Sequence, residues 1–243
     1  MKNKLMQLLQ NNASKERKPL NVIKNEAGTD ATLYVYDVID SYWGVAAKDV
    51  ASALTAIDPN ATLHVRLNSP GGDVFEARAI STLIKEFAGK TVAHVDALAA
   101  SAATTVALAC DEVVMSDGAY FMIHNAWTIA MGNKDDMSEM VALLAKMDGT
   151  IANDYAAKSG KSTDEIAQLM DDETWFTAQE ALDIGLIDSI AASTDKTSNA
   201  SGKYFNLTAY NKAPKALTDP PAEPDMSAIH AKNSRRLRLL SIS

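Results

Sequence analysis

Three short segments carry side chains whose types and spacing could perform acyl transfer. The first is Asn68–Asp73 (NSPGGD), in which two adjacent glycines let the backbone approach a ligand and turn its N–H groups outward. A helix that begins directly afterwards would add positive dipole character there, which suits an oxyanion hole. By itself this turn decides nothing, because a strand–turn–helix junction often needs glycine for its geometry alone.

The second segment is Ala97–Ala103 (ALAASAA), where Ser101 is flanked by small residues between an expected strand and an expected helix. Small neighbours leave room for a substrate carbonyl, and the N–H of Ala102 would point toward its oxygen, as in a nucleophile turn. The structural alternative is a serine that only caps a buried helix, and this alternative is favoured when the segment is considered alone.

The third segment is Phe121–Asn125 (FMIHN), which places His124 at the end of an apolar strand. The imidazole could act as the base for Ser101, although a single histidine in such a place is more often structural. Ser69 and Ser116 are competing nucleophiles, and each is typical of a turn. Because all three segments lie where a strand meets a loop, their combination favours a serine nucleophile with a histidine base.

Strand and helix signals alternate around these segments. Runs rich in β-branched and aromatic residues predict strands, and apolar residues at helical spacing predict helices. The expected strands are 33–39, 62–67, 91–95, 112–115, 120–123 and 186–190; the expected helices are 46–57, 74–87, 99–109, 137–158, 162–170 and 177–183. Asp73, Ser162 and Thr177 are the expected N-caps. This alternation predicts an α/β domain with a largely parallel sheet.

Composition bounds the class of protein. The 243 residues are 47% hydrophobic and 22% charged, a balance typical of a globular chain with a sizeable core. Cys110 is the only cysteine, which excludes a disulfide scaffold. The metal-binding spacings of cysteine and histidine are absent, and no apolar run reaches the ~18 residues of a membrane span. We therefore expect no metal, no cofactor, no membrane partner and a reducing, cytoplasmic location.

Charge divides the chain into three parts. Residues 1–29 carry six basic and two acidic side chains, residues 196–243 carry eight and three, and the stretch between them carries nine and twenty-six. An acidic body argues against nucleic-acid binding by that body. We expect a basic N-terminal segment at 1–29, one domain at 30–191, and a flexible basic tail at 192–243 that is rich in Ser, Thr, Asn and Pro. Residues 226–243 could form a short amphipathic helix on a partner.

The segments LNSPGGDV, ALAASAAT and FMIHNAW occur in the order and approximate spacing of the ClpP-type serine peptidases, which this chain resembles. Residues 147–188 are similar to that family's long handle helix and closing strand, so the resemblance covers roughly residues 30–190. More narrowly, the short body, the DETWFTAQEAL block and the basic RRLRLL tail resemble the ClpP-like head-maturation (prohead) proteases of tailed phages and prophages. The resemblance implies a ClpP/crotonase-like superhelix of repeated β-β-α units, with a largely parallel sheet and a protruding handle helix.

The resemblance also implies a catalytic apparatus. Ser101 would attack the scissile carbonyl to form an acyl-enzyme, and His124 would take its proton and return it to the leaving amine. The backbone N–H groups of Gly72 and Ala102 would hold the oxyanion. No cofactor takes part in this scheme.

The acidic third member of the triad is less directly assigned by the resemblance. The family's aspartate lies five residues before the alanine of a T-A-x-E-A pattern, which here is Ala178 and indicates Glu173. Asp172 is the second choice, with Asp171 beside it. A glutamate can orient and stabilise an imidazole as an aspartate does, with a slightly longer reach.

Substrate binding is implied by strand addition between the edge at 71–75 and the segment 127–130. The residues expected there are Gly71, Asp73, Val74 and Trp127. The implied function is a serine endopeptidase that processes capsid or scaffold proteins in assembling phage proheads in the host cytoplasm. It would act as a homo-oligomeric ring, and the apolar stripe of the helix 137–158 would pack either between subunits or within one. The stripe consists of Met140, Val141, Leu144, Met147 and Ile151.

Other functions stay open. The N-terminal segment does not match the axial loops that admit unfolded substrate from an ATPase partner, so dependence on an unfoldase is an open point. An ATP-dependent ClpP-type subunit and an inert assembly or scaffold protein with the same fold are the main alternatives. A signal-peptide-peptidase-like enzyme would need a lysine base, and none is placed in the matched segments. A crotonase-type acyl-CoA enzyme would not need Ser101 and His124 together.

Overall fold

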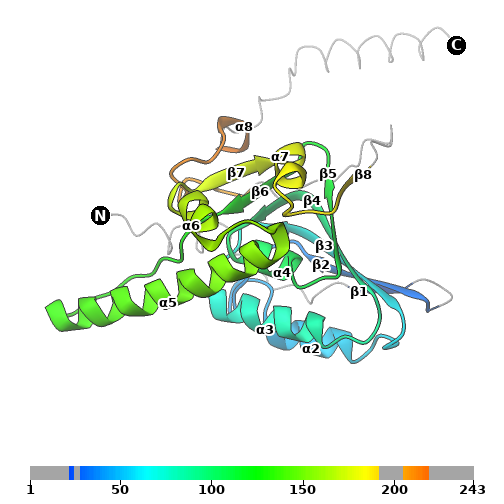
Figure 1. The fold of residues 1–243 in the computed structure, drawn as a ribbon. Coiled ribbons are helices and arrows are strands. Elements are labelled where there is room, and N and C mark those ends of the chain that lie inside the picture. Colours follow the sequence, from blue (N-terminus) through cyan, green and yellow to red (C-terminus); the bar gives the residue numbers. More distant parts are fainter. Residues whose placement is uncertain (1–21, 25–27, 192–204, 219–243) are drawn as a thin grey trace, which may run out of the picture. The chain divides into compact units, whose positions relative to one another are not determined.

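The computed structural model of the chain describes residues 22–24, 28–191 and 205–218 (Figure 1). The chain divides into two compact units, Met1–Ala213 and Pro214–Ser243. Among the described residues, the second unit contains the short helix α8 (Lys215–Thr218), and the first contains the sheet and the other helices.

An eight-stranded sheet forms the centre of the first unit as far as it is described. Its strand order is β1-β2-β3-β4-β5-β8, and β6 pairs with both β4 and β7. The pairs β1–β2 and β6–β7 are antiparallel, and the other pairs are parallel. This mostly parallel sheet confirms the expected α/β class. The strands are β1 (Val22–Lys24), β2 (Asp30–Val35), β3 (Thr62–Ser69), β4 (Thr91–Ala100), β5 (Glu112–Ser116), β6 (Tyr120–Ile123), β7 (Thr174–Thr177) and β8 (Ser189–Ala191).

Strand β4 pairs with β3 along one edge and divides its other edge between two strands. Its first part, 92–95, pairs with β5, and its last part, 98–100, pairs with β6. Parallel pairing brings the carboxyl ends of β4 and β6 to the same edge, and the antiparallel β7 begins at that edge. Three chain segments therefore meet where β4 and β6 end.

Helices cover the sheet and extend beyond it. They are α2 (Ala47–Leu54), α3 (Val74–Lys85), α4 (Ala102–Ala107), α5 (Lys134–Ser159), α6 (Thr163–Asp171) and α7 (Ala178–Asp183). Figure 1 shows α2 and α3 side by side beneath the sheet, and the N-terminal part of α5 reaching away from it. Near the C-terminal end of α5, Ile151, Ala152 and Tyr155 are buried and anchor the helix in the core. In the described part of the chain, no helix is both long and apolar enough to cross a membrane.

The expected N-caps are confirmed. The Asp73 carboxylate accepts from the backbone N–H groups of Phe75 and Glu76 at the start of α3. Ser162 and Thr177 each form a capping box with a glutamate three residues on. Each cap fixes where a helix begins, and the first of them fixes the end of the NSPGG turn.

Several boundaries differ from the sequence prediction. The helix expected at 99–109 begins only at Ala102, because Ala99 and Ala100 continue β4 and pair with β6. The strand expected at 33–39 is β2, which ends at Val35, and the strand expected at 186–190 is β8, which begins at Ser189. The pattern also missed β1 and β7, which are short. The helix expected at 226–243 lies outside the described residues.

Candidate active site

Ser101 lies at the carboxyl end of β4, one residue before α4. Its N–H donates to the Met122 carbonyl at 2.9 Å, which extends the pairing of β4 with β6 by one residue. Its backbone is held at φ 55° and ψ −126°, a region that side-chain-bearing residues rarely occupy. Its side chain makes no capping hydrogen bond to α4, so the helix-cap alternative is wrong.

His124 directly follows β6 and faces Ser101. Its Nε2 lies 2.7 Å from Ser101 Oγ, so the structure brings the expected nucleophile and base into hydrogen-bonding contact. Burial lowers the pKa of His124 to about 4, and the nearby Glu173 carboxylate opposes this shift only in part. At neutral pH the imidazole is therefore uncharged and able to accept a proton.

Glu173 lies next to His124 because of the register of β7. Ile123 at the end of β6 pairs with Thr174 at the start of β7, so the residues just beyond each of them are neighbours. Glu173 is buried, with φ at 50°, and its negative charge raises the pKa of His124. In the described part of the chain its carboxylate does not accept a hydrogen bond from His124.

The Glu173 carboxylate is instead held by the backbone further along the chain. Its two oxygens accept from the N–H groups of Asn211, at 2.9 Å, and Lys212, at 2.5 Å. The Trp175 indole N–H lies 3.4 Å from the same carboxylate. These three N–H donors to one buried carboxylate compensate its charge. Glu173 thus acts on the pKa of His124 through the electrostatic field of its charge.

Asp172, the second choice, faces the solvent. Its carboxylate is exposed, lies 3.3 Å from Lys212 Nζ and accepts from the Gln168 side-chain amide at 3.0 Å. Both contacts lower the pKa of Asp172, with the Gln168 bond as the larger cause. Asp171 accepts from the Asn125 side chain at 2.6 Å. Of the three acidic residues, only Glu173 is buried beside the imidazole, and its role as third member stays a prediction.

The glycine turn lies against the nucleophile. Gly71 and Gly72 have φ values of 87° and 147°, which favour glycine. A Cβ on Gly71 would lie 2.5 Å from the Ala100 carbonyl oxygen and 3.0 Å from the Ala102 nitrogen, so the turn has no room for a side chain. Among the described residues, the N–H groups of Gly72 and Ala102 donate no backbone hydrogen bond. They are therefore free to bind an oxyanion.

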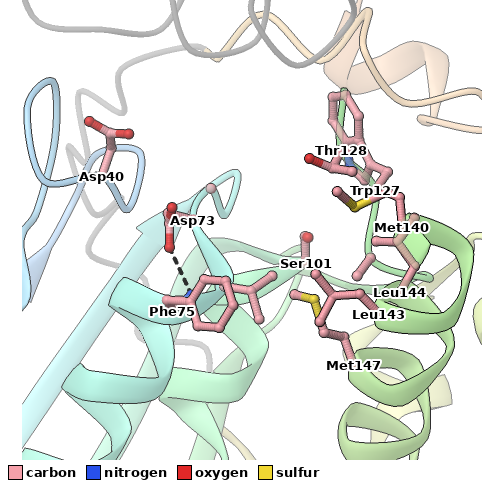
Figure 2. A pocket seen from close by; sticks show the side chains of 13 residues that line it. Asp40, Asp73, Phe75, Ser101, Trp127, Thr128, Met140, Leu143, Leu144 and Met147 are labelled. Atoms are coloured by element: carbon pink, nitrogen blue, oxygen red, sulfur yellow. Dashed lines mark hydrogen bonds between the residues drawn. The ribbon is translucent and has the colours of Figure 1, made fainter. Parts of the chain in front are cut away.

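An apolar pocket of about 210 Å³ opens beside Ser101. Figure 2 shows the Ser101 hydroxyl between Phe75 of α3 on one side and Leu143 and Met147 of α5 on the other. The sequence-predicted Gly72, Asp73, Val74 and Trp127 line this pocket, whereas Gly71, which was also expected to bind substrate, does not. The remaining lining residues are Asp40, Ala126, Thr128, Met140 and Leu144.

The apolar stripe of α5 is divided between three environments. Met140, Leu144 and Met147 line the pocket, whereas Ile151 is buried in the core. Val141 is 67% exposed. Part of the stripe thus packs within the subunit, and the sequence signal for the pocket wall was the helical spacing of this stripe.

Comparison with known proteins places the chain in a family. The sequence model of the family described as Clp protease matches residues 43–194, more than half of the chain. The chain belongs to the Clp protease family.

Relatives in this family are distant but cover most of the domain. The ATP-dependent Clp protease proteolytic subunit 1 of Protochlamydia amoebophila is 28% identical over 170 residues, which cover 68% of this chain and 82% of the relative. The proteolytic subunit 3 of Rhodococcus jostii is 29% identical over 172 residues, or 67% of this chain and 81% of the relative. A solved structure, that of a point mutant of ClpP1 from Listeria monocytogenes, matches with a TM-score of 0.60 at 23% identity, covering 68% of this chain and 92% of that one. The fold is therefore similar to ClpP, and the chain is a member of a serine peptidase family.

A segment beyond the family match also reaches the site. Residues 192–243 were expected to form a mobile tail, but Phe205, Leu207, Ala209 and Tyr210 are buried within the first unit. Residues 205–210 therefore pack into the first unit, because aromatic and aliphatic side chains recur in their otherwise polar sequence. The flexibility of the rest of 192–243 stays a prediction.

Proposed function

We propose that the chain is a serine endopeptidase that hydrolyses peptide bonds through an acyl-enzyme on Ser101. The observation that carries this proposal is the 2.7 Å contact between Ser101 Oγ and His124 Nε2, beside a pocket that opens on the serine. A nucleophile and base within hydrogen-bonding reach are the signature of covalent acyl transfer.

The reaction follows from this geometry. Uncharged His124 takes the Ser101 proton as Oγ bonds to the scissile carbonyl carbon, and the N–H groups of Gly72 and Ala102 bind the resulting oxyanion. The Glu173 charge stabilises the imidazolium, which then protonates the leaving amine as the C–N bond breaks. Water repeats the sequence on the acyl-enzyme and releases the acid product.

The pocket supports a preference for an apolar side chain before the cleaved bond. Its walls carry Val74, Phe75, Leu144 and Met147, and methionine side chains adapt to different apolar shapes. An extended substrate would lie between residues 71–75 and 127–130, of which 72–75, 127 and 128 line the pocket. Fluorogenic peptides with leucine, phenylalanine, lysine or aspartate at this position test the preference.

We further propose that the substrates are capsid or scaffold proteins and that the enzyme acts in phage head maturation. The support is the resemblance of the short body, the DETWFTAQEAL block and the RRLRLL tail to prohead proteases of that type. A homo-oligomeric ring is part of the proposal, and the exposed Val141 and Leu143 of α5 are apolar surface suited to a second copy. A second candidate is an ATP-dependent ClpP-type subunit, which is supported by the names of the relatives.

The first experiment is labelling with a fluorophosphonate probe, read by intact mass. We expect one adduct on the wild type and on Ser116→Ala, and none on Ser101→Ala. A wild type that is never labelled contradicts the peptidase proposal. To separate the two biological roles, the enzyme is given a capsid protein without nucleotide and an unfoldase substrate with a Clp ATPase and ATP. Cleavage only in the second arm contradicts the head-maturation proposal.

A further inference from the structure

The segment 205–212 places an aromatic residue against the catalytic histidine. The Tyr210 ring meets the His124 ring edge-on, with centroids 5.4 Å apart and an interplanar angle of 80°. It also meets the Trp175 ring edge-on, with centroids 5.7 Å apart and an interplanar angle of 77°. Tyr210 is only 6% exposed, so its ring is buried in contact with the imidazole.

The hydroxyl of Tyr210 ties the ring to the glycine turn. It donates a hydrogen bond to the carbonyl oxygen of Pro70, the residue before the two glycines. Burial raises the pKa of Tyr210, and the nearby Ser101 side chain opposes that shift. The hydroxyl therefore remains a neutral donor at neutral pH.

The backbone next to Tyr210 fixes the segment in place. The Asn211 and Lys212 N–H groups bind the buried Glu173 carboxylate, and the Tyr210 N–H donates to the Leu207 carbonyl at 3.0 Å. The ring is thus held by two aromatic neighbours, by its hydroxyl and through its backbone. A side chain fixed in this way restricts the rotation of the imidazole that it contacts.

The segment leaves the substrate side of the site open. None of the residues 205–212 lines the pocket beside Ser101, and the Ser101–His124 contact is already formed with the segment in place. These two observations indicate that the segment 205–212 supports the catalytic pair and does not block substrate.

We propose that Tyr210 is a positioning residue that holds the His124 ring in hydrogen-bonding contact with Ser101. The proposal rests on the peptidase function proposed above. It predicts that kcat depends on Tyr210 while KM does not, because the ring orients the base and does not touch the pocket.

The test uses the full chain with Tyr210→Phe, Tyr210→Leu and Tyr210→Ala. Leu207→Ala is the matched control, since it removes a buried side chain from the same segment and leaves the Tyr210 ring in place. We expect Tyr210→Ala and Tyr210→Leu to lower kcat and the rate of fluorophosphonate labelling by roughly tenfold or more with KM unchanged. Tyr210→Phe keeps the ring and should stay within about threefold of the wild type, as should Leu207→Ala.

An NMR titration of the His124 imidazole, assigned through His124→Gln, provides a readout that does not require activity. The titratable groups that face this ring are Glu173, before β7, and Tyr210, and the Ser101 hydroxyl faces it from the start of α4. Removing the ring admits water, so the pKa of His124 should rise from about 4 toward its ordinary 6.5 in Tyr210→Leu. Tyr210→Leu removes the ring but keeps an apolar side chain in the segment, so this arm stands even where Tyr210→Ala unfolds.

Three outcomes overturn the proposal. One is a folded Tyr210→Leu with the labelling rate and His124 titration of the wild type. Another is faster labelling without Tyr210, which would make the segment inhibitory. The third is a loss of kcat and labelling rate in Leu207→Ala equal to that in Tyr210→Leu, which would mean that any disruption of the segment 205–212 has the same effect. A wild type that shows the low His124 pKa but takes no label contradicts the peptidase function and leaves the ring contact intact.

Discussion

Lowering the pH tests the environment of His124 directly. A general base must be uncharged to accept the serine proton, so the labelling rate of Ser101 follows the neutral fraction of His124. With a pKa of about 4, that fraction is still about 0.9 at pH 5. An ordinary histidine with a pKa of about 6.5 would be only about 0.03 neutral at the same pH, a difference of roughly 30-fold.

The assay is the second-order rate of fluorophosphonate labelling between pH 3.5 and 8, with adducts counted by intact mass. We expect a plateau from pH 8 to about pH 5 and a fall centred near pH 4. The low pKa of folded His124 also makes stability depend on pH. Because His124 binds a proton more readily in the unfolded chain than in the folded one, the free energy of unfolding decreases as the pH falls below about 6.5.

Tryptophan fluorescence at each pH therefore serves as the control, and only rates from folded protein are compared. An inflection near pH 6.5 in folded protein would refute the reasoning, since it would mean that water reaches the imidazole. A second inflection at higher pH would point to another group in the rate-limiting step.

Three further predictions follow from the same geometry. Glu173→Gln should lower the labelling rate by roughly tenfold or more, and it should move the acid inflection to still lower pH because the charge that raises the pKa of His124 is gone. The exposed Asp172→Asn is the control and should change neither the rate nor the inflection. The same pH series of labelling rates measures both variants. Ser162→Ala removes the capping box of α6 and should cost about 1 kcal/mol in urea unfolding with little effect on labelling. Gly72→Ala should prevent folding or abolish labelling, since its Cβ would lie 2.1 Å from a backbone carbonyl oxygen, whereas Gly118→Ala has open space and should cost only about 1 kcal/mol by thermal unfolding.

Much of this site could be predicted because its residues sit at element ends that the sequence marks. Asp73 caps α3 and so fixes the end of the glycine turn. The apolar strand before His124 is β6, with the expected bounds. Ser101 was harder to place, because the small residues around it suit a helix as well as a strand. Tertiary pairing of Ala99 and Ala100 with β6 decided for the strand and moved the helix start beyond the serine.

The rest depends on long-range contacts that local patterns do not encode. Strand β7 is four residues long and gains its hydrogen bonds from β6, so its own sequence carries little signal. Its register is nevertheless what brings Glu173 to His124. The pocket wall likewise combines α3 and α5, which are far apart in sequence.

Residues 205–212 show why the family match alone does not complete the site. The match ends at residue 194, yet the N–H groups that hold Glu173 and the ring that contacts His124 come from beyond it. A glutamate reaches further than an aspartate, and here both of its oxygens are taken up by this later segment. Ser101 and His124 directly follow β4 and β6, whereas the ring that contacts His124 and the N–H groups that hold Glu173 come from residues 205–212. Removing residues 195–243 should therefore leave the nucleophile and base on their strands but free the Glu173 carboxylate and expose the imidazole to water. Such a truncation should change the pH profile of labelling and leave the fold of the sheet unchanged.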